Sequence, residues 1–190
     1  MTISIKDKPA LLLVDIQKGF DDLEYWGGER NNPDAEINAG KLLSFWRLNF
    51  WPVYHVKHCS LNPNSRLAEG QSGNDFKDTV LPIGEEIVIR KNVNSAFIGT
   101  DLKHQLDSSE IKILVIAGLT TDHCVSTTVR MAGNFGYDTY LIDDATATFC
   151  KIGQDGQLFS AKIIHETAIA SLMNEFASVM KTDEIMNVLR

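Results

Sequence analysis

The sequence predicts an α/β fold in which a parallel β-sheet carries helices on both faces. Short, nearly continuous apolar runs alternate with longer stretches of helical periodicity along most of the chain. Such runs are typical of strands buried on both faces of a parallel sheet, and the alternation requires right-handed crossover connections. The 190 residues, 44% of them hydrophobic, are enough for one domain with a full core, so we expect residues 1–190 to form a single domain.

The amino-terminal third of the chain predicts two strands joined by a helix. Residues 10–16 are apolar except for the acidic Asp15, so they predict a buried strand that contains one charged side chain. Residues 34–50 have apolar side chains at helical spacing, and residues 53–56 form a second strand. Residues 61–75 show no period and predict a long loop, and loops of that length often carry function.

The rest of the chain continues the alternation. The Gly-Tyr-Asp turn at residues 136–138 separates a helix from the fifth strand, and the sixth strand is weaker than the others. We expect strands at residues 86–90, 111–117, 139–142 and 178–180, and helices at residues 100–106, 126–135, 160–176 and 183–189.

The composition argues against several classes of partner. The formal charge of -7 and the lack of a basic run disfavour nucleic acid, because neutralising phosphates requires clustered Lys and Arg. No apolar stretch approaches the roughly 20 residues of a membrane span, and residues 1–8 lack the pattern of a secretion signal. Cys59, Cys124 and Cys150 are odd in number and lack metal-type spacing, which suits a reducing compartment. We expect a cytoplasmic protein that acts on a small molecule.

Cys124 stands where a buried strand is expected to turn into a helix. It follows the apolar residues 111–117 and the segment Gly-Leu-Thr-Thr-Asp-His, and a helix-favouring stretch begins at Ser126. The unpaired N–H groups and positive dipole at the start of this helix are expected to lower the pKa of the thiol toward the reactive thiolate. The alternative is a buried structural cysteine, the commoner fate of a free thiol.

Asp15 and Lys91 are expected at the same edge of the sheet as Cys124. Asp15 lies at the carboxyl end of the first strand, and Lys91 directly follows the third. In doubly wound sheets ordered 3-2-1-4-5, ligands bind where the connections after strands one and four diverge. Burying an unpaired carboxylate costs free energy, so a nearby Lys91 ammonium would stabilise the charge of Asp15 and have its own charge stabilised in turn. A structural ion pair is the alternative, but a thiol at the same edge favours a functional site.

Three segments of the chain resemble motifs of the isochorismatase-like cysteine hydrolases, within the isochorismatase/nicotinamidase superfamily. These segments are L-L-V-D-I-Q-K-G-F, V-I-R-K-N-V-N-S-A-F-I-G-T-D-L and A-G-L-T-T-D-H-C-V-S-T-T-V-R-M-A, and the likeness extends over residues 9–176. The resemblance implies a Rossmann-like three-layer sandwich whose five- or six-stranded parallel sheet has the order 3-2-1-4-5(-6). It also implies that Asp15, Lys91 and Cys124 form a catalytic triad.

The resemblance further implies the role of each residue in the triad. Cys124 attacks a carbonyl carbon, Asp15 takes the thiol proton and later activates water, and Lys91 holds the aspartate. The backbone N–H groups of Thr120 and Cys124 would form the oxyanion hole, in which each donor contributes about 2.7 to 4 kcal/mol. The family also has a non-proline cis peptide bond in this turn, which corresponds to Leu119-Thr120.

Nicotinamidases of this family bind a metal after the second strand, through an Asp and two His residues. This chain has His55-Val56-Lys57-His58 there, with no Asp and with a Lys between the histidines, so we expect no metal and no cofactor. Retention of Cys124 favours hydrolysis of a small amide or related C–N bond. The alternatives are an isochorismate-type vinyl ether hydrolase and a non-catalytic ligand-binding or redox-sensing domain. The turn after the first strand lacks the glycines of a nucleotide-binding dehydrogenase.

Aromatic and polar residues near the predicted edge are candidates for substrate binding. Core packing is the favoured interpretation for one of them, Phe97, and His123 could equally serve the turn. Apolar residues at 135–140 and 185–189 also predict a homo-oligomer, a dimer or tetramer. The candidate substrate-binding residues are Phe20, Tyr25, Trp26, Asn92, Phe97 and His123.

Overall fold

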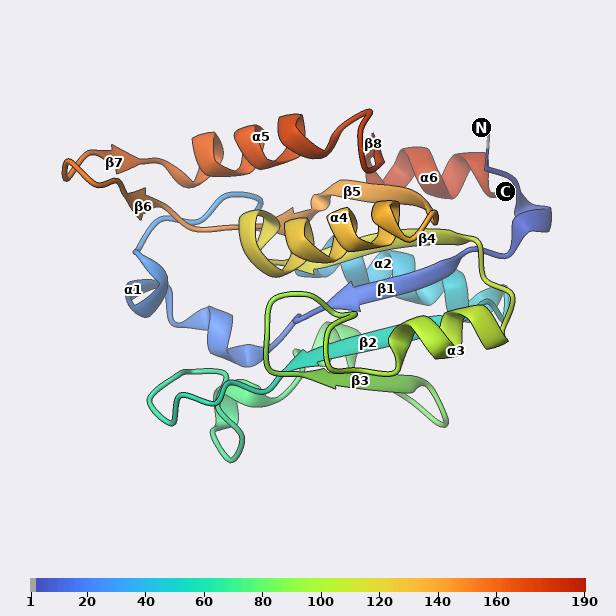
Figure 1. Ribbon diagram of the computed structural model, residues 1–190, viewed down its shortest axis with the longest axis horizontal. Coiled ribbons are helices and arrows are strands. Elements are labelled where there is room, and N and C mark those ends of the chain that lie inside the picture. Colours follow the sequence, from blue (N-terminus) through green and yellow to red (C-terminus); the bar gives the residue numbers. More distant parts are fainter. Residues whose placement is uncertain (1–2) are drawn as a thin grey trace.

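Six parallel strands form the central sheet of the computed structural model, which describes residues 3–190 (Figure 1). Their order is β3-β2-β1-β4-β5-β8, and every neighbouring pair is parallel. This confirms the predicted fold class and strand order. The strands are β1 (Ala10–Val14), β2 (Val53–His58), β3 (Ile87–Lys91), β4 (Ile113–Leu119), β5 (Asp138–Ala147) and β8 (Ser178–Met180).

Helices cover both faces of the sheet, as the alternation of elements predicts (Figure 1). On one face, α2 (Ala35–Leu48) packs on β1, and α6 (Thr182–Val188) packs on α2 and β5, in a cluster that includes Leu11 and Leu13 of β1. On the other face, Leu12 and Val14 face a second cluster, because successive strand residues point to opposite sides. That cluster is covered by α3 (Leu102–Ser108), α4 (Ser126–Asn134) and α5 (Ala161–Leu172).

Several boundaries differ from the sequence-based expectations. The first strand ends at Val14, because Asp15 adopts a left-handed φ of 53° that leaves the extended conformation. The helix expected to reach residue 176 ends at Leu172, since the chain becomes extended and Asn174 has a φ of 66°. The fifth strand runs on to Ala147. The short elements that were not predicted include α1 (Leu23–Trp26) and the antiparallel pair β6 (Lys151–Ile152) and β7 (Leu158–Phe159).

The carboxyl ends of β1, β2, β3 and β4 meet at one edge of the sheet, on the left in Figure 1. Gly118 allows β1 and β4 to approach closely there. A Cβ at this position would lie 2.0 Å from the carbonyl oxygen of Val14, and the φ of 139° also suits only glycine. The two strands that carry Asp15 and the turn before Cys124 are therefore held side by side.

Two of the apolar residues from which self-association was predicted are buried within their own chain. Ile185 and Leu189 are fully buried against α2 and the sheet of their own chain, so they offer no surface to a second copy. Phe135 is 42% exposed, and the homo-oligomer stays a prediction. Within residues 3–190, no helix combines the length and the apolarity that crossing a bilayer requires.

Candidate active site

Asp15 and Lys91 form a buried ion pair at the carboxyl edge of the sheet. Lys91 Nζ lies 2.5 Å from Asp15 Oδ2, and neither side chain contacts solvent. The other carboxylate oxygen, Asp15 Oδ1, is buried and accepts no hydrogen bond from the residues that the structure describes. One oxygen is thus held by the ammonium, while the second is free to accept a proton.

Cys124 lies beside this pair, in a single wide turn, η5 (Thr121–Val125), that joins β4 to α4. A carboxylate oxygen of Asp15, a ring nitrogen of His58 and the Sγ of Cys124 all lie within 4.8 Å of one another. Cys124 as a whole is 8% exposed, and its Sγ is 3.9 Å from the Oδ1 of Asn94. The predicted residues Asp15, Lys91 and Cys124 are therefore brought together.

The expectation of a lowered thiol pKa is wrong. Burial raises the pKa of Cys124 well above its usual range, and the negative charge of Asp15 adds to this effect, while Lys91 opposes it. The regular helix begins only at Ser126, after the turn that carries Cys124. The free protein thus holds a protonated thiol next to a carboxylate that can accept its proton.

His58, which the sequence analysis considered only as a metal ligand, is the fourth member of the cluster. Its Nδ1 is 3.0 Å from Lys91 Nζ and 4.0 Å from Asp15 Oδ2. Because β2 and β3 are in register with His58 opposite Lys91, the two side chains emerge together from neighbouring strand ends. The position of His58 at the end of a strand next to the first was the signal that could have found it.

The two histidines of β2 do not converge on a metal site of the nicotinamidase type. His55 is fully buried, and its Nε2 contacts Glu86 Oε2 at 2.8 Å, away from the cluster. His58 contacts the Lys91 ammonium, a positive charge that also holds Asp15. The residues present therefore do not fit that metal, since one histidine is committed elsewhere and the other faces a cation.

The turn before Cys124 is held by a buried polar network. The Leu119-Thr120 peptide bond is cis, at the position that the family resemblance implies, and the Thr120 carbonyl accepts hydrogen bonds from the N–H groups of residues 123 and 125. The side chain of Thr121 contacts His165 Nδ1 at 2.9 Å, and His165 Nε2 contacts Asp143 Oδ1 at 2.7 Å. Sequence reasoning missed this network, because α5 and β5 supply its members from distant parts of the chain.

The aromatic candidates after β1 form a cluster rather than an open wall. Phe20 is 3% exposed and lies 4.7 Å, centroid to centroid, from Trp26, whose indole N–H donates to a backbone carbonyl. Phe149, which was not predicted, stacks on both rings. Tyr25 is 44% exposed and meets Trp26 edge to face. Of this group, Tyr25 is the side chain most available to a ligand.

The remaining candidates have different surroundings. Phe97 packs against Phe135 and Tyr137, as the core interpretation predicts. Asn92 lines a cavity of about 210 Å³ that also includes Lys91. The side chain of His123 is 56% exposed and lies near Asp122 and Lys151 at the mouth of the turn.

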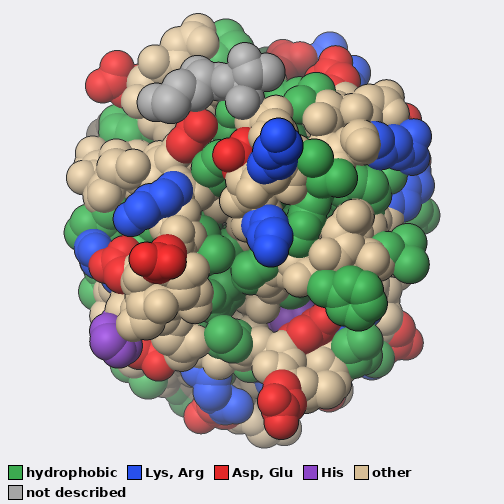
Figure 2. All heavy atoms as spheres, turned by 90° about the vertical axis from the view of Figure 1, so that its right-hand side faces the viewer, with side chains coloured by type: hydrophobic (Ala, Val, Ile, Leu, Met, Phe, Trp, Pro, Cys, Tyr) green, Lys and Arg blue, Asp and Glu red, His purple; other side chains and the backbone are tan. Residues whose placement is uncertain are grey.

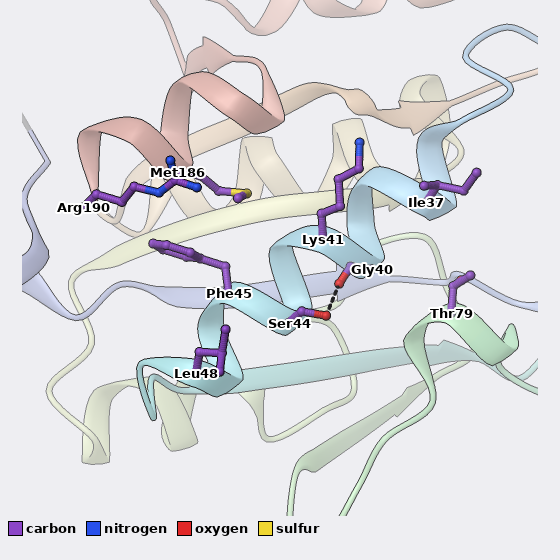
Figure 3. A pocket seen from close by; sticks show the side chains of 9 residues that line it. All are labelled: Ile37, Gly40, Lys41, Ser44, Phe45, Leu48, Thr79, Met186 and Arg190. Atoms are coloured by element: carbon purple, nitrogen blue, oxygen red, sulfur yellow. Dashed lines mark hydrogen bonds between the residues drawn. The ribbon is translucent and has the colours of Figure 1, made fainter.

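A larger apolar groove, of about 590 Å³, lies between α2 and α6 (Figure 3). Phe45, Leu48 and Met186 line it, and Lys41 and Arg190 lie at its rim, whereas none of the triad borders it. Figure 2, which views the molecule from the side opposite the carboxyl edge, shows charged side chains of both signs scattered among hydrophobic ones. The chemistry of Asp15, Lys91 and Cys124 is confined to the other edge.

The fold is that of Rossmann-like α/β proteins, and comparisons with known proteins give the family. The model of the isochorismatase domain matches residues 9–184, so the chain belongs to the isochorismatase family and is a hydrolase of that family. The isochorismatase family protein YrdC of Bacillus subtilis is 47% identical, over 96% of this chain and 97% of the relative. Nicotinamidase 3 of Arabidopsis thaliana is 27% identical, over 95% and 88% of the two chains. The crystal structure of an isochorismatase family hydrolase from Chromobacterium violaceum superimposes with a TM-score of 0.92, at 42% identity and 96% and 93% coverage.

Proposed function

We propose that this hydrolase cleaves a small amide or related C–N bond through a thioester on Cys124. The observation that carries the proposal is the buried Lys91–Asp15 pair, whose aspartate has one unpartnered oxygen and lies in the same 4.8 Å cluster as the thiol. A carboxylate is a suitable base for a protonated thiol, and covalent catalysis divides one difficult cleavage into two easier steps.

In the first half of the reaction, Asp15 takes the thiol proton as Cys124 Sγ forms a bond to the carbonyl carbon. The carbonyl electron pair moves to oxygen, where the N–H groups of Thr120 and Cys124 would stabilise it. The tetrahedral intermediate then collapses, the C–N bond breaks, and the leaving amine takes the proton from Asp15. Lys91 keeps Asp15 in place and offsets its negative charge throughout.

In the second half, Asp15 accepts a proton from water as the water oxygen attacks the thioester. The C–S bond breaks, and the departing sulfur of Cys124 recovers the proton that Asp15 holds. The product is a carboxylic acid or its carbamic equivalent, and the enzyme returns to its starting state. The raised thiol pKa suits this order of events, because the proton leaves the sulfur only when the carbonyl carbon is present to receive the electron pair.

Relatives with named substrates support a C–N bond as the target. One is named a nicotinamidase and another, from Streptomyces noursei, a streptothricin hydrolase, although this chain matches only 62% of the latter's length. Tyr25, Asn92 and His123 are the exposed candidates for recognising the substrate. Phe20, Trp26 and Phe97 would shape the site from the core.

A panel of amides, ureides and N-carbamoyl compounds assayed for ammonia release tests the proposal. We expect at least one substrate, and we expect intact-protein mass spectrometry of the quenched reaction to show an acyl adduct that maps to Cys124. Cys124→Ala should abolish turnover and leave the unfolding curve unchanged, whereas Cys59→Ala should retain activity. Full hydrolysis by Cys124→Ala would remove the nucleophile assignment. Cleavage of vinyl ethers alone, or reversible oxidation of Cys124 without an adduct, would support the two alternatives.

A further inference from the structure

His58 is held at the carboxyl edge of the sheet by two buried amide side chains. Its backbone N–H donates to Gln17 Oε1 at 2.8 Å, and its carbonyl accepts from Gln17 Nε2 at 3.0 Å and from Asn74 Nδ2 at 2.8 Å. Gln17 is fully buried, and Asn74 is 4% exposed. Three hydrogen bonds therefore fix the backbone of a residue that the triad chemistry does not require.

The contact between His58 and Lys91 determines where the imidazole carries its proton. An ammonium group only donates hydrogen bonds, so His58 Nδ1, 3.0 Å from Lys91 Nζ, must accept. The ring is then neutral, with its proton on Nε2. Asp15 and His58 thus engage two of the three ammonium protons of Lys91.

We propose that His58 is a positioning residue of the active site, which as a neutral acceptor at Nδ1 holds the Lys91 ammonium against Asp15. The inference rests on the proposed function of Asp15, Lys91 and Cys124. Without this acceptor, the lysine has one partner instead of two, and its flexible stem no longer has a single orientation. His58 thus acts on the reaction through the lysine.

Protonation of His58 would remove this support. An imidazolium has no acceptor and would place a second positive charge 3.0 Å from Lys91. The groups that face the ring are Lys91, Asp15 and Cys124. Burial lowers the pKa of His58 from its ordinary value and Lys91 lowers it further, while Asp15 opposes them, so the neutral form persists into mildly acidic solution.

Two substitutions separate the acceptor from the bulk of the ring. His58→Asn places an amide oxygen near the position of Nδ1, whereas His58→Leu fills the space without an acceptor. We expect His58→Leu to lower kcat by about tenfold or more, with a smaller change in KM, because hydrogen bonds to charged groups contribute about that factor. His58→Asn should retain kcat within about threefold, and the acid limb of its pH profile should move to lower pH. His104→Asn on the exposed side of α3 is the matched control and should leave kcat and the acid limb of the pH profile unchanged.

Imidazole ¹⁵N NMR of the parent protein tests the inference without any substrate. The expected spectrum shows neutral His58 with the proton on Nε2 and a midpoint of titration below 6.5, the ordinary value. A proton on Nδ1 at neutral pH would overturn the inference, as would a His58→Leu variant with the parent kcat and acid limb. Failure of the proposed function is a separate result, because it appears as the lack of a Cys124 adduct in the parent protein.

Discussion

Replacing Lys91 with Met removes the positive half of an ion pair that has no contact with water. The substitution keeps a flexible side chain of similar length, so the main change is the loss of the charge 2.5 Å from Asp15. The carboxylate is then left buried with neither oxygen paired to the lysine, and Oδ1 already has no partner within residues 3–190. Breaking a buried pair in this way costs about 3–5 kcal/mol, a large part of the roughly 5–15 kcal/mol that stabilises a domain.

Guanidinium unfolding followed by tryptophan fluorescence measures this cost as a lower midpoint with an unchanged slope. The double variant Asp15→Asn with Lys91→Met should recover most of the loss, because no uncompensated charge remains. Lys103→Met is the matched control: Lys103 also lies 2.5 Å from a carboxylate, that of Asp107, but the two side chains are 44% and 48% exposed. The control should change the free energy of unfolding by less than about 1 kcal/mol. A Lys91→Met variant as stable as the control, or a double variant no better than the single, would refute the reasoning.

Three further variants test the electrostatics and packing of the described structure. Asp15→Asn removes a charge that raises the pKa of Cys124. Alkylation of this thiol by iodoacetamide should therefore be faster in the variant than in the parent protein at every pH below the pKa of the thiol. An unchanged dependence of the alkylation rate on pH would contradict this. Burial raises the pKa of Glu86, but hydrogen bonds from Arg47 and other groups together lower it by a larger amount, so that the pKa is about 2. The stability this gives is present above pH 4.5 and lost as pH falls through about 2, so Glu86→Gln should flatten the dependence of the unfolding midpoint on pH across that window. Gly118→Ala should lower the melting temperature strongly, whereas Gly70→Ala should lower it less. Of the two added Cβ atoms, only the one at position 118 would clash with backbone, because it would lie 2.0 Å from the carbonyl oxygen of Val14. Equal effects of the two substitutions would contradict this.

The strand order and the meeting of Asp15, Lys91 and Cys124 were predictable from the sequence. The strand order came from the resemblance to the isochorismatase-like hydrolases. The meeting of the three residues depends on a general property of parallel sheets, that residues after different strands reach the same edge regardless of their separation along the chain. The contacts of Ile185 and Leu189 were not predictable in the same way. An apolar helix face looks the same in a sequence whether it packs on its own sheet or on a second copy.

The electrostatics of Cys124 could not be read from local sequence. A following helix predicts a lowered thiol pKa, but the sign depends on burial and on the distance to Asp15, which is more than 100 residues away along the chain. The role of His58 has the same origin. Its contact with Lys91 depends on the register of β2 and β3, which no pattern within either segment specifies.

The amide anchor formed by Gln17 and Asn74 separates two parts of the long loop between β2 and β3. Residues 61–64 are exposed, whereas Asn74 also holds the carbonyl of Leu67 at 2.8 Å, so the loop is fixed to the sheet behind its exposed tip. Changes in length or composition at the tip can therefore alter what reaches the site without moving His58. For engineering a new specificity, residues 61–64 are the segment to diversify, and Gln17 and Asn74 are the residues to keep.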